Sequence, residues 1–368
     1  MRILYITTVS CTINAFLGPH IEMLVHEGHQ VDLASNFTEW GVDNLFEKLG
    51  CRAFQVDFSR SPLSPDNIRA YGQLKKVVEE GNYDIVHCHT PNASVITRLV
   101  CRKYRKHGLK VFYTAHGFHF YKGAPKLNWL VFYPVEKFCS RFTDKLITIN
   151  QEDYALARER FHAREVHYVP GVGIDLSRFE NIQVDRAAKR REIGVPEDAF
   201  LMLSVGELNE NKNHQVVVRA LAELKSNMAY YAIAGTGDTE DELNKLAAQL
   251  GISDRVQLLG YRCDVMELYC CADLFCFPSF REGLSVSLME AMACGLPCVV
   301  SSIRGNVDLI GDDPRFFFSP FSVDSCRTAI EGMLDKQDAT LVGNNRARVA
   351  RFSIENVLKN LKEVYGIG

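Results

Sequence analysis

The chain has 368 residues, of which 47% are hydrophobic and 24% are charged, so it is long enough for two globular domains of ordinary size. Its formal net charge of −3 argues against a nucleic-acid partner. Residues 1–180 hold 22 Lys and Arg against 19 Asp and Glu, so the basic excess lies in the first half and favours an acidic partner or surface there.

The twelve cysteines include no CxxC pair. Most lie in apolar runs, such as Cys276 in LFCFP and Cys298 in CVVS, and are expected to be small buried hydrophobes in a reducing cytosol. His87, Cys88 and His89 lie in a strand-like run, where Cys88 would point opposite to the two histidines. Because no further ligand set accompanies them, we expect no metal site.

The chain begins with MRILYITTV, which is expected to be a strand with no signal peptide before it. No apolar run approaches the roughly 20 residues that a membrane-spanning helix needs. The sequence therefore predicts a cytoplasmic protein, and any membrane role would be peripheral, at the inner face.

Strands and helices alternate along the first half, which predicts a parallel sheet covered on both faces. A helix that ends at Gly28 follows the first strand. Further helices are predicted at residues 67–80 and 93–107. The strands of this half are predicted at residues 2–9, 29–35, 51–58, 83–90, 110–116, 145–150 and 165–171.

The stretch YVPGVGIDLSRF, residues 168–179, is rich in Pro and Gly and interrupts this alternation. The pattern then restarts, with strands at 200–206, 228–235, 256–260, 274–278 and 298–302 and helices at 214–224, 241–250, 266–271, 285–294 and 354–365. We therefore predict two domains, residues 1–173 and 183–350, joined by a hinge at 174–182 and followed by a helical segment at 351–368.

Residues 278–301 read PSFREGLSVSLMEAMACGLPCVVS, in the order strand end, loop, helix and strand. The loop and the helix N-terminus should lie at the carboxyl edge of a parallel sheet, where open α/β sheets bind ligands. Glu282 and Glu290 can face one cleft there, and a carboxylate suits vicinal hydroxyls of a sugar or ribose. Two solvated surface glutamates are the alternative. The N–H groups available to a phosphate belong to Gly283, Leu284 and Ser285.

The run EGLSVSLMEAMACGLPCVVS resembles the donor-site signature of retaining glycosyltransferases of family 4, in which E, seven residues and E precede A-M-A-x-G-x-P. This resemblance implies the GT-B fold: two Rossmann-like parallel-sheet α/β domains with an interdomain cleft, the first binding the acceptor and the second the nucleotide-sugar donor. It places Glu282 by the donor sugar, the amides of residues 283–285 at the diphosphate, and Glu290 on the ribose. It also implies a terminal helix that crosses back to the first domain.

Two further residues acquire roles from this resemblance. His116 follows a predicted strand and precedes a glycine, where the family has a His that contacts the donor sugar or its phosphate; a structural loop histidine is the alternative. Lys212 matches the family's diphosphate lysine. Glu207 stands where the family usually has Arg, and its charge would repel a diphosphate. The cations that could compensate are Arg281, Arg304 and Arg262.

The remaining donor contacts are also implied by position. Gly260, Tyr261 and Arg262 match the segment whose backbone meets the nucleobase, and Asn306 stands in a loop near the donor where a second Gly is frequent. The first loop, residues 10–14, lacks the paired glycines that usually approach the donor phosphate.

Residues 98–126 combine cations with aromatic side chains, which is what binding to an anionic leaflet needs. A solvated helix face beside a buried aromatic cluster is the alternative. If the surface is functional, the acceptor would be a lipid-linked sugar. The cations are Arg98, Arg102, Lys103, Arg105, Lys106, Lys110, Lys122 and Lys126.

The resemblance is closest to enzymes that assemble capsule or exopolysaccharide repeat units. It implies a retaining hexosyltransferase that moves a sugar from a UDP-sugar to a glycan or polyprenyl-linked sugar, with no metal or other cofactor. Because the sequence offers no enzymic nucleophile, we favour front-face attack, with Lys212 and helix amides stabilising the departing diphosphate. A UDP-sugar epimerase and a non-catalytic nucleotide-sugar binding partner stay open as alternatives, the second because of Glu207 and the glycine-poor first loop.

Overall fold

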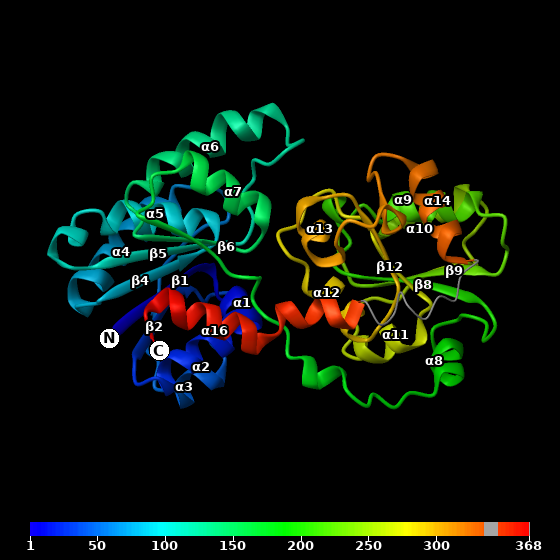
Figure 1. The fold of residues 1–368 in the computed structure, drawn as a ribbon, viewed down its shortest axis with the longest axis horizontal. Helices are drawn as coiled ribbons and strands as arrows, with labels where there is room; N and C mark the ends of the chain where they lie inside the picture. Colours follow the sequence, from blue (N-terminus) through cyan, green and yellow to red (C-terminus); the bar gives the residue numbers. More distant parts are fainter. Residues whose placement is uncertain (335–344, 368) are drawn as a thin grey trace. The chain divides into compact units, whose positions relative to one another are not determined.

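The computed structural model describes residues 1–334 and 345–367. The chain divides into two compact units (Figure 1). The N-terminal unit comprises Met1–Gly173 and Ile354–Gly368, and the C-terminal unit comprises Ile174–Ser353. Ile174 and Phe179, from the segment predicted as a hinge, are buried in the core of the C-terminal unit. Each unit contains a parallel sheet with packed helices, which confirms the predicted architecture of two Rossmann-like α/β domains.

The N-terminal unit is built on a seven-stranded sheet with the order β3-β2-β1-β4-β5-β6-β7, in which neighbouring strands pair in parallel. The chain starts in the middle of the sheet and is wound outward in both directions, so β1 and β4 sit side by side at the point where the direction reverses. The strands are β1 Arg2–Val9, β2 Gln30–Asn36, β3 Ala53–Gln55, β4 Ile85–His89, β5 Lys110–Ala115, β6 Lys145–Thr148 and β7 Glu165–Tyr168.

Two apolar clusters form the core of this unit, one on each face of the sheet. Helices α4, α5 and α6 contribute to one cluster, and helices α2 and α16 contribute to the other. The helices are α1 Ser10–Thr12, α2 Gly18–His26, α3 Asn44–Lys48, α4 Asp66–Gly81, α5 Pro91–Cys101, α6 Lys126–Ser140, α7 Gln151–Arg160 and α16 Ile354–Tyr365.

The terminal helix α16 packs into the N-terminal unit, although the other residues of that unit lie far from it in the sequence. Val357, Leu361 and Val364 recur at helical spacing and are buried against that core. At the end of the helix, the Tyr365 hydroxyl lies 2.6 Å from Nδ1 of His87 on β4 and 3.2 Å from the hydroxyl of Tyr5 on β1. Apolar periodicity and this buried polar contact together attach the chain's last helix to its first sheet.

The C-terminal unit has a six-stranded sheet with the order β10-β9-β8-β11-β12-β13, again with parallel pairs. Helices α9, α10 and α14 pack together as one group, and α8 packs on α11. The strands are β8 Phe200–Val205, β9 Ala229–Ala234, β10 Val256–Leu258, β11 Leu274–Phe277, β12 Cys298–Ser301 and β13 Phe317–Phe318. The helices are α8 Arg186–Glu192, α9 His214–Glu223, α10 Glu240–Gln249, α11 Val265–Cys271, α12 Val286–Ala293, α13 Arg304–Ile310 and α14 Val323–Leu334.

The first loop differs from the glycine-rich turn that the family resemblance suggests. The chain passes directly from β1 into α1 and then into a π-helical turn at Ile13–Leu17, whose Ile13 and Leu17 are buried. Apolar side chains at these two positions favour a packed helical segment over an open, glycine-lined loop.

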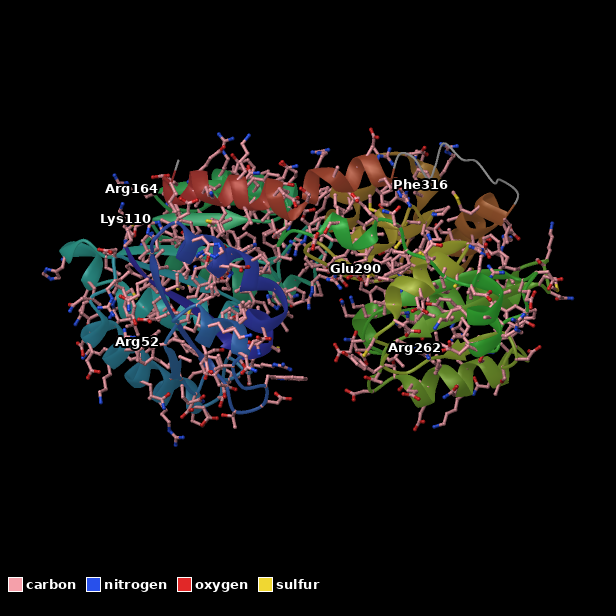
Figure 2. The ribbon with its side chains drawn as sticks, turned by 90° about the horizontal axis from the view of Figure 1, so that it is seen from below. Arg52, Lys110, Arg164, Arg262, Glu290 and Phe316 are labelled. Atoms are coloured by element: carbon pink, nitrogen blue, oxygen red, sulfur yellow. The ribbon has the colours of Figure 1, made fainter. Side chains whose placement is uncertain are left out.

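The prediction of an exposed cationic surface is wrong for Arg98. Arg98 is 1% exposed, and its guanidinium donates to Glu136 at 2.8 Å and stands 4.3 Å from the ring centre of Tyr113. Arg105 is also engaged, at 2.6 Å from Asp144. The cations that remain exposed in residues 98–126 are Arg102, Lys103, Lys106, Lys110 (Figure 2), Lys122 and Lys126.

None of the helices described within residues 1–334 and 345–367 has both the length and the apolar character needed to cross a bilayer.

Candidate active site

The loop between β11 and α12 lies at the carboxyl edge of the second sheet. Ser285 begins α12 as its N-cap, with its hydroxyl accepting from the backbone N–H of Leu288 at 3.4 Å. Gly305, at the start of α13, lets a second helix approach: a Cβ there would lie 1.8 Å from the carbonyl oxygen of Gly283. The close approach brings the starts of α12 and α13 to the loop that carries Glu282.

The loop after β8 meets the loop after β11 through a set of hydrogen bonds. The side-chain amide of Asn211 donates to the carbonyl of Arg281 at 2.9 Å, and the N–H of Phe280 donates to the carbonyl of Asn211 at 2.8 Å. Asn213, at a φ of 52°, donates to the carbonyls of Pro278 and Pro320. These hydrogen bonds fix the loop after β8 against the loop after β11, although the two are distant in sequence.

This arrangement brings together two of the predicted residues. The Nζ of Lys212 lies 2.8 Å from Oε1 of Glu282, with side chains that are 19% and 17% exposed, and it stands 5.0 Å from the ring centre of Phe277. The N–H of Lys212 is itself fixed by the side chain of Asn209 at 3.0 Å. Lys212 is therefore a partly buried cation, held over an aromatic ring and paired with a single carboxylate at the edge of the sheet.

Glu290 (Figure 2) lies on α12, and its Oε2 accepts from the hydroxyl of Tyr269 on α11 at 3.0 Å. Burial raises the pKa of Glu290, while the hydrogen bond from Tyr269 and the charge of Arg178 lower it. The carboxylate is thus oriented by a partner that local sequence does not reveal, since Tyr269 sits in the apolar run MELYCC. The side chain is therefore not the solvated surface glutamate of the alternative interpretation.

The segment predicted to meet the nucleobase is a turn. Gly260 has a φ of 67° and its carbonyl accepts from the N–H of Gly235 at 2.8 Å, and Tyr261 next to it is 80% exposed. The guanidinium of Arg262 (Figure 2) donates to Asp264 at 2.7 Å and to Glu192 at 2.5 Å. The charge of Arg262 is therefore neutralised by its own neighbours, which makes it a poor replacement for the missing arginine.

Of the other predicted cations, Arg281 belongs to the loop that carries Glu282, and Arg304 contacts it. The Nε of Arg304 donates to the carbonyl of Glu282 at 3.4 Å, and Arg281 precedes Glu282 in the chain. Glu207 is exposed, and its carboxylate accepts from the side chain of Asn209 at 2.9 Å. Asn306 is fully buried, and its amide donates to the carbonyl of Ser301 at 3.0 Å, so this side chain connects α13 to β12.

His116 lies in the N-terminal unit, directly after β5. Its Nε2 is 3.0 Å from Nδ1 of His89, whose ring stacks on Tyr5 with centroids 5.3 Å apart. Burial, together with the nearby His20, lowers the pKa of His116 to about 4. The imidazole is therefore uncharged at pH 7, and it can form a hydrogen bond with a ligand without adding a positive charge.

The buried histidines should make the fold sensitive to acid. Burial lowers the pKa of His20, His116 and His214 to about 4, and it lowers the pKa of His87 and His89 well below 6.5. Between pH 6.5 and 4 the unfolded chain binds protons that the folded chain does not, so the free energy of unfolding should fall as the pH is lowered. Each histidine contributes about 1.4 kcal/mol per unit of pKa difference.

Urea unfolding measured at pH 7, 6 and 5 tests this expectation. His214→Gln should flatten the pH dependence, whereas His26→Gln, at an exposed position, should leave its slope unchanged. Equal slopes for the two variants would contradict the assignment of the acid sensitivity to buried imidazoles.

Within residues 1–334 and 345–367, no group of three or more His, Cys, Asp or Glu side chains is placed to hold a metal ion.

Comparison with known proteins places the chain in a family. The model described as Glycosyltransferase Family 4 matches residues 20–178, and the model described as Glycosyl transferases group 1 matches residues 185–351. The chain is 37% identical to the glycosyltransferase EpsD of Bacillus subtilis (strain 168), with 99% of this chain and 96% of that protein covered.

Two further likenesses agree with this placement. The chain is 27% identical to the UDP-Gal:alpha-D-GlcNAc-diphosphoundecaprenol alpha-1,3-galactosyltransferase of Escherichia coli, with 79% of this chain and 77% of that protein covered. The structure of HepE from Anabaena in complex with UDP-glucose matches with a TM-score of 0.78 at 20% identity, and covers 100% of this chain and 99% of that chain. The predicted GT-B fold is thereby confirmed. The chain belongs to the family 4 glycosyltransferases, which use nucleotide sugars.

Proposed function

We propose that this protein is a retaining hexosyltransferase that moves a sugar from a UDP-sugar to a polyprenyl-diphosphate-linked sugar in surface polysaccharide synthesis. The observation that carries the proposal is the contact of Lys212 with Glu282 beside the start of α12, the helix that also carries Glu290. The E. coli relative is named for a UDP-galactose donor and a diphosphoundecaprenol-linked acceptor. A relative from Campylobacter jejuni, 26% identical over 85% of this chain, is also named for a diphospho-undecaprenol acceptor. Such an acceptor would place the enzyme at the inner face of the membrane.

In the proposed reaction, Glu290 accepts hydrogen bonds from the ribose hydroxyls, and the N–H groups of Gly283, Leu284 and Ser285 face the diphosphate. Lys212 passes from Glu282 to the phosphate oxygens, which leaves Glu282 to accept from hydroxyls of the donor sugar. Charge stabilisation of this kind, arranged before the reaction begins, is commonly the largest catalytic contribution.

The chemical step breaks the bond between the anomeric carbon and the phosphate oxygen. The acceptor oxygen forms its bond to that carbon on the face from which UDP leaves, and its proton passes to the departing phosphate. Anomeric configuration is therefore retained without a covalent enzyme intermediate. His116, neutral at pH 7, takes part as a hydrogen-bonding residue at the sugar.

Glu290→Ala should weaken UDP binding by about 10- to 100-fold, because a hydrogen bond to a charged group contributes about 1.5–3 kcal/mol. Isothermal titration of UDP measures this change directly. Glu242→Ala, an exposed carboxylate on α10, serves as the control and should bind UDP as the unmodified protein does. Unchanged UDP affinity in Glu290→Ala would remove the ribose contact from the proposal.

Incubation with a panel of UDP-sugars, with and without lipid-linked acceptors, separates the proposal from the two alternatives. A transferase gives slow UDP release alone and a longer glycan with its acceptor. An epimerase would convert the UDP-sugar into its isomer without any acceptor, and a non-catalytic partner would bind UDP without transfer or hydrolysis. Either of the last two outcomes would overturn the proposal.

A further inference from the structure

The N-terminal unit contains an apolar hollow of about 400 Å³ between α5, α6 and the segment after β5. Val95 and Ile96 line it from α5, and Val131 and Val135 line it from α6. Leu63, in the loop before α4, also lines it and is 92% exposed. A concave surface of this size and composition is suited to a hydrocarbon segment.

A second hollow, of about 410 Å³, adjoins the first and is more polar. Thr8, Thr12 and Thr90 line it at the carboxyl ends of β1 and β4, where this sheet changes its winding direction, and Arg60 supplies a cation to its wall. The two hollows are neighbours, because both are lined by Pro62, Pro91, Asn92, His119 and Phe132. A single ligand can therefore extend from a polar, cationic compartment into an apolar one.

The carboxylate in the apolar hollow is already satisfied. Oε2 of Glu136 lies 2.8 Å from the buried guanidinium of Arg98, and Oε1 lies 3.4 Å from the hydroxyl of Tyr113. Because the charge of Glu136 is neutralised within the wall, an uncharged chain can enter without leaving an ion unpaired. The wall therefore favours an uncharged hydrocarbon over a second ionic group.

We propose that the apolar hollow binds the first isoprene units of a polyprenyl diphosphate acceptor, with the diphosphate at Arg60 and the linked sugar in the polar hollow. The inference rests on the proposed function, which supplies an acceptor with a hydrocarbon chain joined to a diphosphate. Its basis is the adjacency of two unlike compartments: such a lipid joins a polar, anionic head to a hydrocarbon chain, and here a hollow lined by threonines and Arg60 lies next to an apolar one.

Binding of farnesyl diphosphate and of inorganic pyrophosphate, measured by titration calorimetry without vesicles or detergent, tests this inference. The unmodified protein should bind farnesyl diphosphate at least ~10-fold more tightly, because transferring the chain out of water is favourable. Val135→Gln and Val95→Phe, which make the hollow polar or fill it, should each lose most of that preference. Thermal unfolding of each variant shows whether it remains folded. Because one substitution changes the polarity of the hollow and the other changes its volume, the two variants test the inference independently.

Leu130→Gln is the matched control, since Leu130 lies on the same helix, is 74% exposed and is not part of the hollow. It should keep the preference for farnesyl diphosphate. Equal loss in Leu130→Gln and Val135→Gln would show adsorption to the exposed face of α6, as expected for a bilayer-binding surface, and would overturn the inference. The inference would also be overturned if the unmodified protein bound farnesyl diphosphate and inorganic pyrophosphate equally well.

Turnover distinguishes this inference from the proposed function. Acceptors with the same sugar diphosphate but a farnesyl or a methyl group should differ in kcat/KM, with farnesyl preferred by at least ~10-fold. Transfer at equal kcat/KM to both acceptors would overturn the lipid site and leave the transferase intact. Tight farnesyl diphosphate binding that depends on Val95 and Val135, with no transfer to any lipid-linked sugar, would uphold the site and overturn the transferase.

Discussion

Lys212→Met should lower kcat by about 100- to 1,000-fold with any accepted UDP-sugar, because removing one preorganised group that stabilises developing charge costs about 2.7–4 kcal/mol. Lys212 is the cation that the structure holds against Glu282, over the ring of Phe277 and at the edge of the sheet where α12 begins. Methionine keeps much of the side chain's length and removes only the charge. The release of UDP in the presence of the acceptor measures the effect.

Three comparisons sharpen this test. Lys245→Met removes an exposed lysine from α10 and should leave kcat unchanged. Lys212→Arg keeps the charge and should restore part of the lost rate, although the fork of a guanidinium fits this contact differently. The double variant Lys212→Met/Glu282→Gln shows how much of the loss comes from an unpaired carboxylate. A kcat within threefold of the unmodified value in Lys212→Met would contradict a role in the departure of the diphosphate.

The structure around the candidate site that the sequence predicts well is local. Glu282, Ser285 and Glu290 belong to one strand, loop and helix unit, which the residue pattern of 278–301 predicts over a short stretch of chain. In the structure, Ser285 caps α12 and Gly295 follows its end with a φ of 78°. For the same reason the boundaries of α12 and α16 lie within one or two residues of the prediction. Short-range patterns determine short-range structure, and the fold class follows from their alternation.

The contacts that complete the site are long-range and had no local signal. Lys212 reaches Glu282 across 70 residues, and the hydroxyl of Tyr269 reaches Glu290 across 21. Lys212 and Glu282 meet because parallel strands bring loops from different parts of the chain to one sheet edge, whereas Tyr269 and Glu290 meet because α11 and α12 pack together. The sequence reveals the residue types at such an edge, but not their partners.

Helix α6 was not predicted, and its composition explains why. It contains Pro134 in its interior, and its apolar residues occupy two faces. Trp129, Phe132 and Tyr133 pack against the core, whereas Leu127 and Leu130 on the other side are 66% and 74% exposed. The continuous apolar run from Trp129 to Tyr133 obscures the 3.6-residue period on which helix prediction depends. Tertiary packing, which the sequence does not display, maintains this helix.

Glu136→Ala should reduce the free energy of unfolding by about 3–5 kcal/mol, because it leaves the guanidinium of Arg98 buried without a counter-ion. Arg98 is 1% exposed, and its other contacts, with the carbonyl and hydroxyl of Ser94 and the ring of Tyr113, supply no formal charge to replace the carboxylate. Chemical unfolding followed by circular dichroism measures the change. Glu80→Ala provides the contrast, since Glu80 pairs with Lys76 at 3.9 Å on an exposed face, where such a pair contributes about 0–1 kcal/mol.

The double variant Arg98→Met/Glu136→Leu determines whether the loss comes from an unpaired charge or from lost packing. Replacing both partners of a buried ion pair with apolar residues is often neutral or stabilising, so this variant should recover most of the stability lost in Glu136→Ala. If it remains as unstable as the single variant, the pair's volume rather than its charge is what the core requires. Glu136 also lines the apolar hollow, so the double variant would make that wall more apolar. An accompanying rise in affinity for farnesyl diphosphate would connect the stability of α6 to the lipid site.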